Sequence, residues 1–264
     1  MKSIQGGNMS NVDEQADDAG GTAKPRVQSA VRVSRILIFV AESSAGVKAR
    51  DISERLGIPR QATYHLVHTL LTIGMLRKND QNRYVLGLAA APIASGLQRQ
   101  LAPQEHIRSL VRSVVSETHE TAYAVGWVED EVVILFSARG DSVVQAAEES
   151  LGRSYDAHAR ASGKLLLALA DADRRDRYIS RHALTARTPN TLTTLHALNQ
   201  ALDEIRAQGY SLEREEYALG LSCLAVPVPA TQNKIALAIS VPKERLEQRL
   251  EDYLATMRRI VQLT

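Results

Sequence analysis

Residues 49–86 constrain the fold of this chain more than any other stretch. They contain Ala-Arg-Asp-Ile-Ser-Glu-Arg-Leu-Gly-Ile-Pro at 49–59, then a helical pattern, then the basic turn Arg-Lys-Asn-Asp-Gln-Asn-Arg at 77–83. A short helix that breaks at Gly57, a second helix entered through Pro59 and a charged hairpin are the parts of a winged helix-turn-helix. In such a module one helix lies in the major groove of DNA.

The second helix of this pair is predicted to have an apolar and a polar side. Apolar residues recur at helical spacing, namely Ala62, Leu66, Leu70 and Ile73. At about 100° per residue, the opposite side carries side chains that can hydrogen-bond to base edges. They are Arg60, Gln61, Tyr64 and His68, with His65 on the flank. We expect this side to read DNA sequence, and an ordinary solvent-facing helix surface is the alternative interpretation.

Cationic side chains flank this helix and are predicted to contact phosphates, which fixes the position of the protein on DNA but reads no sequence. They are Arg50, Arg77, Lys78 and Arg83. The residues on both sides of the turn Asn-Asp-Gln-Asn at 79–82 are compatible with β-strands, so a hairpin wing is expected.

The distribution of charge agrees with a polyanionic partner. Residues 24–100 hold 12 Lys and Arg against 4 Asp and Glu, whereas residues 101–264 hold 19 against 22. A net charge of +2 for the whole chain therefore conceals a basic N-terminal module. Basic charge concentrated on one module is expected of a protein that binds double-stranded DNA.

Length and composition predict two domains. The chain has 264 residues, 44% of them hydrophobic, which is enough for two cores. We expect a disordered tail at 1–23, the winged helix-turn-helix at 24–87, a linker helix at 88–102, and an effector-binding and oligomerisation domain at 103–264. A single Cys and the lack of an apolar run of about 20 residues predict a cytoplasmic protein that does not use a membrane.

The periodicity of the remaining sequence predicts an α+β domain with a mainly antiparallel sheet, because strand patterns at both ends enclose a helical middle. The predicted helices are 29–42, 161–170, 173–181, 195–208 and 243–262, with one more around Ile107 to Thr118. The predicted strands are 122–128, 132–138, 143–146, 210–213, 223–228 and 235–241.

Five segments together resemble a known family. In chain order they are Val-Gln-Ser-Ala at 27–30, Asp-Ile-Ser-Glu-Arg-Leu-Gly-Ile-Pro at 51–59, Arg-Tyr-Val-Leu-Gly at 83–87, His-Ala-Arg-Ala-Ser-Gly-Lys-Leu-Leu-Leu-Ala at 158–168, and Glu-Arg-Glu-Glu-Tyr-Ala-Leu-Gly-Leu-Ser-Cys-Leu-Ala-Val-Pro-Val at 213–228. The chain resembles the IclR family of bacterial transcription regulators. This resemblance implies a GAF-like effector domain, homodimers or homotetramers, and control of DNA binding by a small metabolite, often a carboxylate or an aromatic acid.

Three positions differ from the pattern of that family. His65 stands where an Arg is often found, so an operator cannot be transferred from relatives. Asn82 replaces a Gly that is common in the wing turn, and Asn tolerates a positive φ there. Glu213 replaces the usual Asp and is one methylene longer, which bears on the identity of the ligand.

The start of the helix predicted at 161–170 is a candidate effector site. Its unpaired N–H groups and positive dipole end suit a carboxylate, and small residues would let a ligand approach. The family resemblance places the pocket between this helix start and the strands at 213, 223 and 240. The predicted site residues are Ala161, Ser162, Gly163, Glu213, Leu221, Cys223, Leu224 and Ser240, with the two Leu as apolar wall.

Each of these residues also has a more ordinary interpretation. Ser162 and Gly163 can be a plain helix start, and for Cys223 the role of a small buried apolar residue is favoured. Glu213 repels an anionic ligand unless it is protonated or paired, or it accepts from a ligand hydroxyl or a backbone N–H.

Two other classes of protein are alternatives to a ligand-responsive regulator. Cys223, His158 and Glu213 are residue types of a nucleophilic triad but lack a local signature, and His65 with His68 lack a third metal ligand. A structural DNA-binding protein would leave 103–264 without a task. We therefore predict a homo-oligomeric regulator of operator DNA, with a small-molecule effector and without catalytic residues, metal or cofactor.

Overall fold

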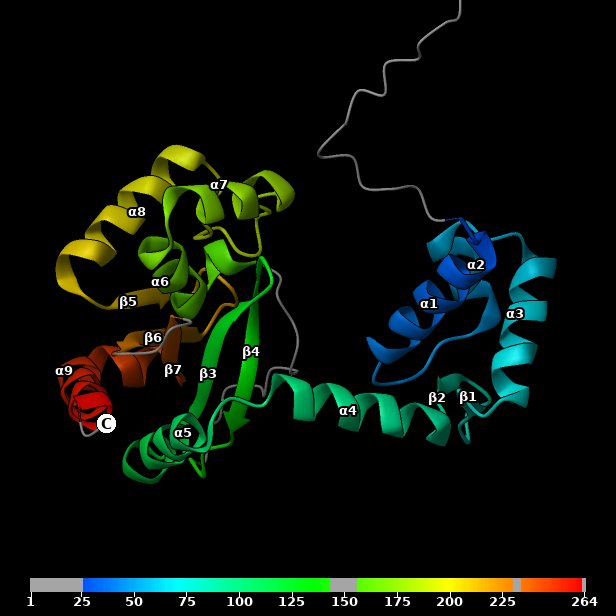
Figure 1. Ribbon diagram of the computed structural model, residues 1–264, viewed down its shortest axis with the longest axis horizontal. Helices are drawn as coiled ribbons and strands as arrows, with labels where there is room; N and C mark the ends of the chain where they lie inside the picture. Colours follow the sequence, from blue (N-terminus) through cyan, green and yellow to red (C-terminus); the bar gives the residue numbers. More distant parts are fainter. Residues whose placement is uncertain (1–25, 143–155, 230–233, 263–264) are drawn as a thin grey trace, which may run out of the picture. The chain divides into compact units, whose positions relative to one another are not determined.

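The computed structural model describes residues 26–142, 156–229 and 234–262 (Figure 1). They belong to two compact units that divide between Ile93 and Ala94, inside the predicted linker. The predicted tail at 1–23 and the predicted strand at 143–146 lie outside the described residues.

The first unit is a winged helix-turn-helix. Gly57 ends its second helix with a φ of +64°, which is the left-handed conformation that Gly adopts without strain. The two strands pair antiparallel, and Asn82 in the turn has the positive φ that the sequence predicts. The elements are α1 (Gln28–Ala41), α2 (Ala49–Leu56), α3 (Arg60–Thr72), β1 (Leu76–Lys78) and β2 (Tyr84–Leu86).

The predicted apolar side of α3 is partly wrong. Leu70 is buried as expected, but Thr63 and Val67 are the other buried residues, whereas Ile73 follows the helix end and is 56% exposed. Thr63 can be buried because its hydroxyl bonds to the carbonyl oxygen of Pro59 at 3.2 Å. The predicted core positions 62 and 66 are half-buried at the edge of this side.

The predicted linker helix begins later than expected. Leu88–Ala90 forms a 3₁₀ turn, η1, and α4 then runs from Ala91–Leu101. Pro92 has no N–H to donate, which is tolerated in the first turn of a new helix. None of the α4 side chains is buried.

The second unit is built on a five-stranded sheet in the order β4-β3-β7-β6-β5, and every neighbouring pair is antiparallel. The predicted α+β class is confirmed. The strands are β3 (Thr121–Val128), β4 (Glu131–Ala138), β5 (Ser211–Arg214), β6 (Leu221–Val228) and β7 (Ile235–Pro242). The helices are α5 (Glu105–Thr118), α6 (Ala161–Leu169), α7 (Ala172–Arg181), α8 (Leu195–Gln208) and α9 (Lys243–Gln262), with a 3₁₀ turn, η2 (Ala157–Ala159).

Helices cover both faces of this sheet (Figure 1). One hydrophobic cluster joins α5 and α9 to residues such as Leu224, Leu237 and Ile239. The other joins α6 and α8 to residues such as Ala225 and Ala238 on the opposite face. Because both faces are buried, β3 and β7 are almost continuously apolar instead of alternating.

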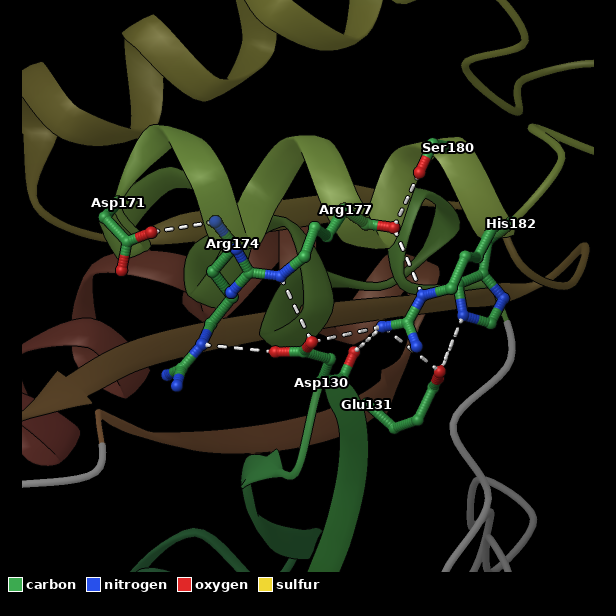
Figure 2. A network of polar contacts seen from close by, with 8 residues as sticks. Asp130, Glu131, Asp171, Arg174, Arg177, Ser180 and His182 are labelled. Carbon is green, nitrogen blue, oxygen red and sulfur yellow. Dashed lines mark hydrogen bonds and ion pairs between the residues drawn. The ribbon is translucent and has the colours of Figure 1, made fainter. Parts of the chain in front are cut away.

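Ion pairs hold α7 to the turn between β3 and β4 (Figure 2). Asp130 Oδ2 lies 3.2 Å from Arg177 Nε, and Arg181 donates to the Asp130 carbonyl oxygen at 2.9 Å. His182 Nε2 lies 2.9 Å from a carboxylate oxygen of Glu131. The hydrogen bond from Arg177 lowers the pKa of Asp130. Tyr178, the buried side chain of this polar helix, packs in the hydrophobic cluster with Trp127, so α7 is attached at the end of the sheet through an apolar contact as well as through charged groups.

Candidate functional site

The predicted base-reading residues all lie on the solvent-facing side of α3. Tyr64 is 60% exposed although it is a large aromatic residue. Within the described residues, these side chains make no hydrogen bond or ion pair with other parts of the protein, so their polar groups are available to a partner. The exposed set is Arg60, Gln61, Tyr64, His65 and His68.

The predicted phosphate-binding cations differ in how freely they can move. Arg50 pairs with Glu54 one helical turn away, with Nε and Oε1 2.7 Å apart, and both side chains are exposed. Arg83 is half-buried and donates through Nη1 to the carbonyl oxygen of Gly46 at 3.3 Å. A guanidinium has five donors, so both residues keep donors for phosphate. Arg77 and Lys78 on β1 are exposed.

Two glycines that the sequence argument did not single out position the wing. A Cβ atom built on Gly87 would lie 2.0 Å from the carbonyl oxygen of Gly74, so the end of the hairpin packs directly against the turn after α3. Gly74 itself has a φ of +71°. A glycine at each end of the hairpin was the available signal, because close backbone approach needs residues without a side chain.

The predicted effector residues of the sheet lie side by side in one row. Antiparallel register places Glu213 opposite Cys223, and Cys223 opposite Ser240. Side chains in register point to the same face, which here is the face covered by α6. Glu213 is completely buried and Ser240 is 7% exposed. The structure thus brings polar groups from three strands together beneath a helix.

Leu224 is not part of this row, so its prediction as a wall of the pocket is wrong. It lies in the cluster with α5 and α9 on the other face, because successive residues of a strand point to opposite faces. Leu221 is two residues before Cys223 and therefore shares its face.

The start of α6 is buried and tightly packed. Ser162 is 9% exposed, and Ala161 and Gly163 are buried. A Cβ built on Gly163 would lie 2.3 Å from the carbonyl oxygen of Ala157, so η2 fills that position. This contact gives Gly163 a packing role independent of any ligand.

The two carboxylate oxygens of Glu213 differ in their surroundings. Oε1 accepts from the backbone N–H groups of Glu216 at 2.5 Å and Tyr217 at 3.0 Å. Oε2 is buried and has no hydrogen-bond partner among the described residues. Burial raises the pKa of Glu213, and the N–H of Tyr217 and the thiol of Cys223 oppose that rise. Acceptance from a backbone N–H was one of the roles the sequence left open for Glu213.

Cys223 has the surroundings of a neutral thiol. Its Sγ lies 3.2 Å from the hydroxyl oxygen of Ser240, and burial raises the pKa of the thiol well above its ordinary value. His158 is buried, and its Nε2 hydrogen-bonds with the carbonyl oxygen of Thr185 at 3.1 Å. A nucleophilic thiol needs a base that removes its proton, and this arrangement raises its pKa instead.

The turn at 215–219 contributes residues that the sequence argument missed. Lys164 Nζ lies 2.5 Å from Glu216, and the Lys164 side chain is buried while that of Glu216 is half-buried. The guanidinium of Arg160 lies 3.6 Å from the centre of the Tyr217 ring and that of Arg187 lies 4.9 Å from it. These partners are distant in sequence, and the only available signal was a Lys between apolar residues, which needs a partner when buried.

Two cavities lie elsewhere on the second unit. A hollow of about 710 Å³ is lined by the end of α7 and the start of α8, and one of about 170 Å³ by β5, β6 and α9. Neither is lined by a predicted effector residue. Among the described residues, no cluster of His, Cys, Asp or Glu could hold a metal ion, and no helix is long and apolar enough to cross a membrane.

A winged helix-turn-helix joined to an antiparallel α+β unit with buried polar groups defines a class of DNA-binding transcription regulators. Residues 29–80 match the IclR helix-turn-helix domain, and residues 102–262 match the C-terminal domain described as bacterial transcriptional regulator IclR C-terminal. The chain therefore belongs to the IclR family of bacterial transcription regulators. Its members are regulators and not enzymes, which excludes the alternative built on Cys223 and His158.

Similar proteins span both units. The regulator XynR of Escherichia coli is 27% identical, over 86% of this chain and 90% of its own length. The regulator BhcR of Paracoccus denitrificans is 31% identical, over 86% of this chain and 79% of its own. The crystal structure of an IclR homologue from Microbacterium hydrocarbonoxydans, complexed with 4-hydroxybenzoate, has a TM-score of 0.64 at 20% identity, over 89% of this chain and 100% of its own. At this level of identity, the similarity to the Microbacterium hydrocarbonoxydans structure shows that the two proteins share a fold.

Proposed function

We propose that a small organic acid modulates the DNA binding of this regulator by binding between the start of α6 and strands β5, β6 and β7. The observation that carries the proposal is the row of Glu213, Cys223 and Ser240 beneath α6, in which Glu213 and Ser240 are buried and Cys223 is half-buried. Interior faces are normally apolar, and convergent polar groups in such a place are typical of a binding site.

The chemistry around the row supports an acid. The first N–H groups of α6, from Ala161 to Gly163, have no acceptor within the helix and lie at its positive end. Arg160, directly before α6, and Arg187 add positive charge around Tyr217. An IclR homologue has been solved with 4-hydroxybenzoate, and this supports an aromatic or other carboxylic acid as the class of effector.

The exposed side of α3 is proposed to read base edges, with Gln61 and Tyr64 as central residues and Arg83 on a phosphate. A homodimer or homotetramer would present two such helices to a partly palindromic operator. The effector can change DNA affinity only if it binds one arrangement of the oligomer more tightly than another.

A screen of carboxylic and aromatic acids tests this function. The melting temperature of the full chain is measured with each acid, and operator affinity is then titrated by gel shift with and without the acids that stabilise it. At least one acid is expected to raise the melting temperature and to change operator affinity. An acid that binds without any change in operator affinity would contradict the proposed regulation.

A further inference from the structure

Glu213 has one satisfied carboxylate oxygen and one that lacks a partner. Oε1 accepts two backbone N–H groups, whereas Oε2 is buried without a hydrogen bond among the described residues. A buried acceptor left unpaired costs about 1–3 kcal/mol, and more when it is charged. Such atoms are few in native proteins, so this oxygen needs a physical explanation.

The neighbouring groups of the row do not explain it. The polar atoms of Cys223 and Ser240 are hydrogen-bonded to each other at 3.2 Å. The Cys223 thiol lies beside Glu213, but a thiol is only a weak donor. The row therefore holds one strong acceptor, Glu213 Oε2, for which the described part of the chain offers only the weak thiol of Cys223 as a donor.

The carboxylate cannot easily turn away to find another donor. Its Oε1 is fixed by the turn at 215–219, and that turn is held from outside by Thr188, whose hydroxyl donates to the Glu215 carbonyl oxygen at 2.6 Å. Thr191 donates to the Glu216 carbonyl oxygen at 2.5 Å, and Lys164 pairs with the Glu216 side chain. The direction of Oε2 is therefore set before any ligand arrives.

The charges around the site favour different chemical groups at the two ends of a ligand. An acid group placed on Glu213 would meet a like charge, whereas Arg160 and the start of α6 attract it. The group that reaches Glu213 must instead be a hydrogen-bond donor.

We infer that the effector is an acid with an additional hydroxyl or amino group, which donates to Glu213 Oε2, and that Glu213 thereby selects it over the plain acid. This inference rests on the proposed effector site and names the chemistry that the site requires. A site that holds a buried acceptor discriminates against the analogue without the donor, because that analogue leaves the acceptor unpaired.

Isothermal titration calorimetry on the full chain tests the inference with two sets of probes. One set is benzoate, 4-hydroxybenzoate and 4-aminobenzoate, and the smaller, flexible set is butyrate and 4-hydroxybutyrate. In at least one set, the donor-bearing acids are expected to bind about tenfold more tightly than the plain acid, or better, given the energy of an unpaired buried acceptor.

Glu213→Gln is the informative variant. Its amide oxygen still accepts the two backbone N–H groups, so the amide NH₂ replaces Oε2 and faces the ligand donor. The advantage of 4-aminobenzoate is expected to fall to about threefold or less, while the plain acid keeps its affinity. Where only the smaller set binds, Glu213→Asp is the test, because the hydroxyl of 4-hydroxybutyrate can also accept from the amide NH₂. Should this variant fail to fold, Glu213→Asp retains the charge but retracts it by one methylene, and the same ratio is expected to shrink.

Ser222→Ala is the matched control. The Ser222 hydroxyl is also buried without a partner among the residues that the structure describes, but it lies one residue from Cys223 and so on the other face, where it lines the 170 Å³ cavity. All affinities should stay within about threefold in this variant, since the Ser222 side chain points to the opposite face of the sheet from the ligand.

The outcomes separate the two proposals. Failure of every probe to bind the wild-type protein overturns the proposed effector site together with this inference. Binding of plain and donor-bearing acids with equal affinity, or an unchanged ratio in Glu213→Gln, overturns the inference alone.

Discussion

Replacing Gly163 by Ala tests whether the start of α6 is fixed by packing against η2. The added Cβ would lie 2.3 Å from the Ala157 carbonyl oxygen and 2.5 Å from its Cα. These are backbone atoms, so no side chain can rotate away and one of the two segments must shift. Overpacking of this kind costs about 1–3 kcal/mol.

The expected loss of stability is readily measured. The second unit has about 170 residues. In a unit of that size about 1 kcal/mol lowers the melting temperature by roughly 2–4 °C, which gives a decrease of about 2–12 °C. Trp127, the single Trp of the chain, is 6% exposed in the cluster beneath α6, so its fluorescence reports the unfolding of this unit.

Gly96→Ala in α4 provides the control. The nearest atom to its added Cβ is the far end of the Arg99 side chain at 3.9 Å, so this change should be neutral or stabilise by up to about 1 kcal/mol. An unchanged melting temperature in Gly163→Ala would show that η2 yields without strain, and the packing role assigned to Gly163 would be refuted.

Four other results are expected. Gln61→Ala should weaken binding to operator by about 1–3 kcal/mol more than binding to random DNA, whereas Arg83→Ala should weaken both alike, and gel-shift titrations that show identical behaviour would contradict these roles. Ser162→Leu, once shown to fold by circular dichroism, should abolish the response to effector while operator affinity without effector stays within about threefold, and a normal response would place the site elsewhere. Cys223 should react with a thiol reagent far more slowly in the folded than in the denatured protein, because burial raises its pKa, and equal rates would argue against a protonated thiol. The pKa of Glu213 is raised in the folded state, so this group favours folding below its unfolded pKa and loses that contribution as pH rises through the folded pKa. The melting temperature of Glu213→Gln should therefore rise relative to that of the wild type as pH increases above about 4.5, and a difference that does not change with pH would contradict the shift.

Local patterns in the sequence were sufficient for most of the fold. The break at Gly57 and the turn at 79–82 are set by backbone preferences of single residues, and both appear as predicted. The inner side of α3 was misplaced because Thr63 counts as polar in a pattern but is satisfied by main-chain carbonyl oxygens. Leu224 was misplaced because it lies three residues from Leu221 in β6, and residues an odd number apart in a strand point to opposite faces, so the two Leu cannot line the same wall.

Only part of the candidate effector site could be predicted from the sequence. The meeting of Glu213, Cys223 and Ser240 was predictable because the family resemblance indicated which strands lie side by side. The contacts of Arg160 with Tyr217 and of Lys164 with Glu216 join segments more than 50 residues apart, and no local pattern encodes them. Long-range pairing is decided by packing, which a single sequence does not display.

The backbone of the turn at 215–219 is held independently of the side chains that the turn carries. Thr188 and Thr191 hold it through the carbonyl oxygens of residues 215 and 216, and those atoms are present whatever side chains the turn carries. Exchanging Tyr217 or Leu219 therefore leaves these anchors in place. A library restricted to such positions would vary the side chains presented around the proposed effector site on a constant backbone, which makes this turn a suitable place to change the ligand specificity proposed for that site.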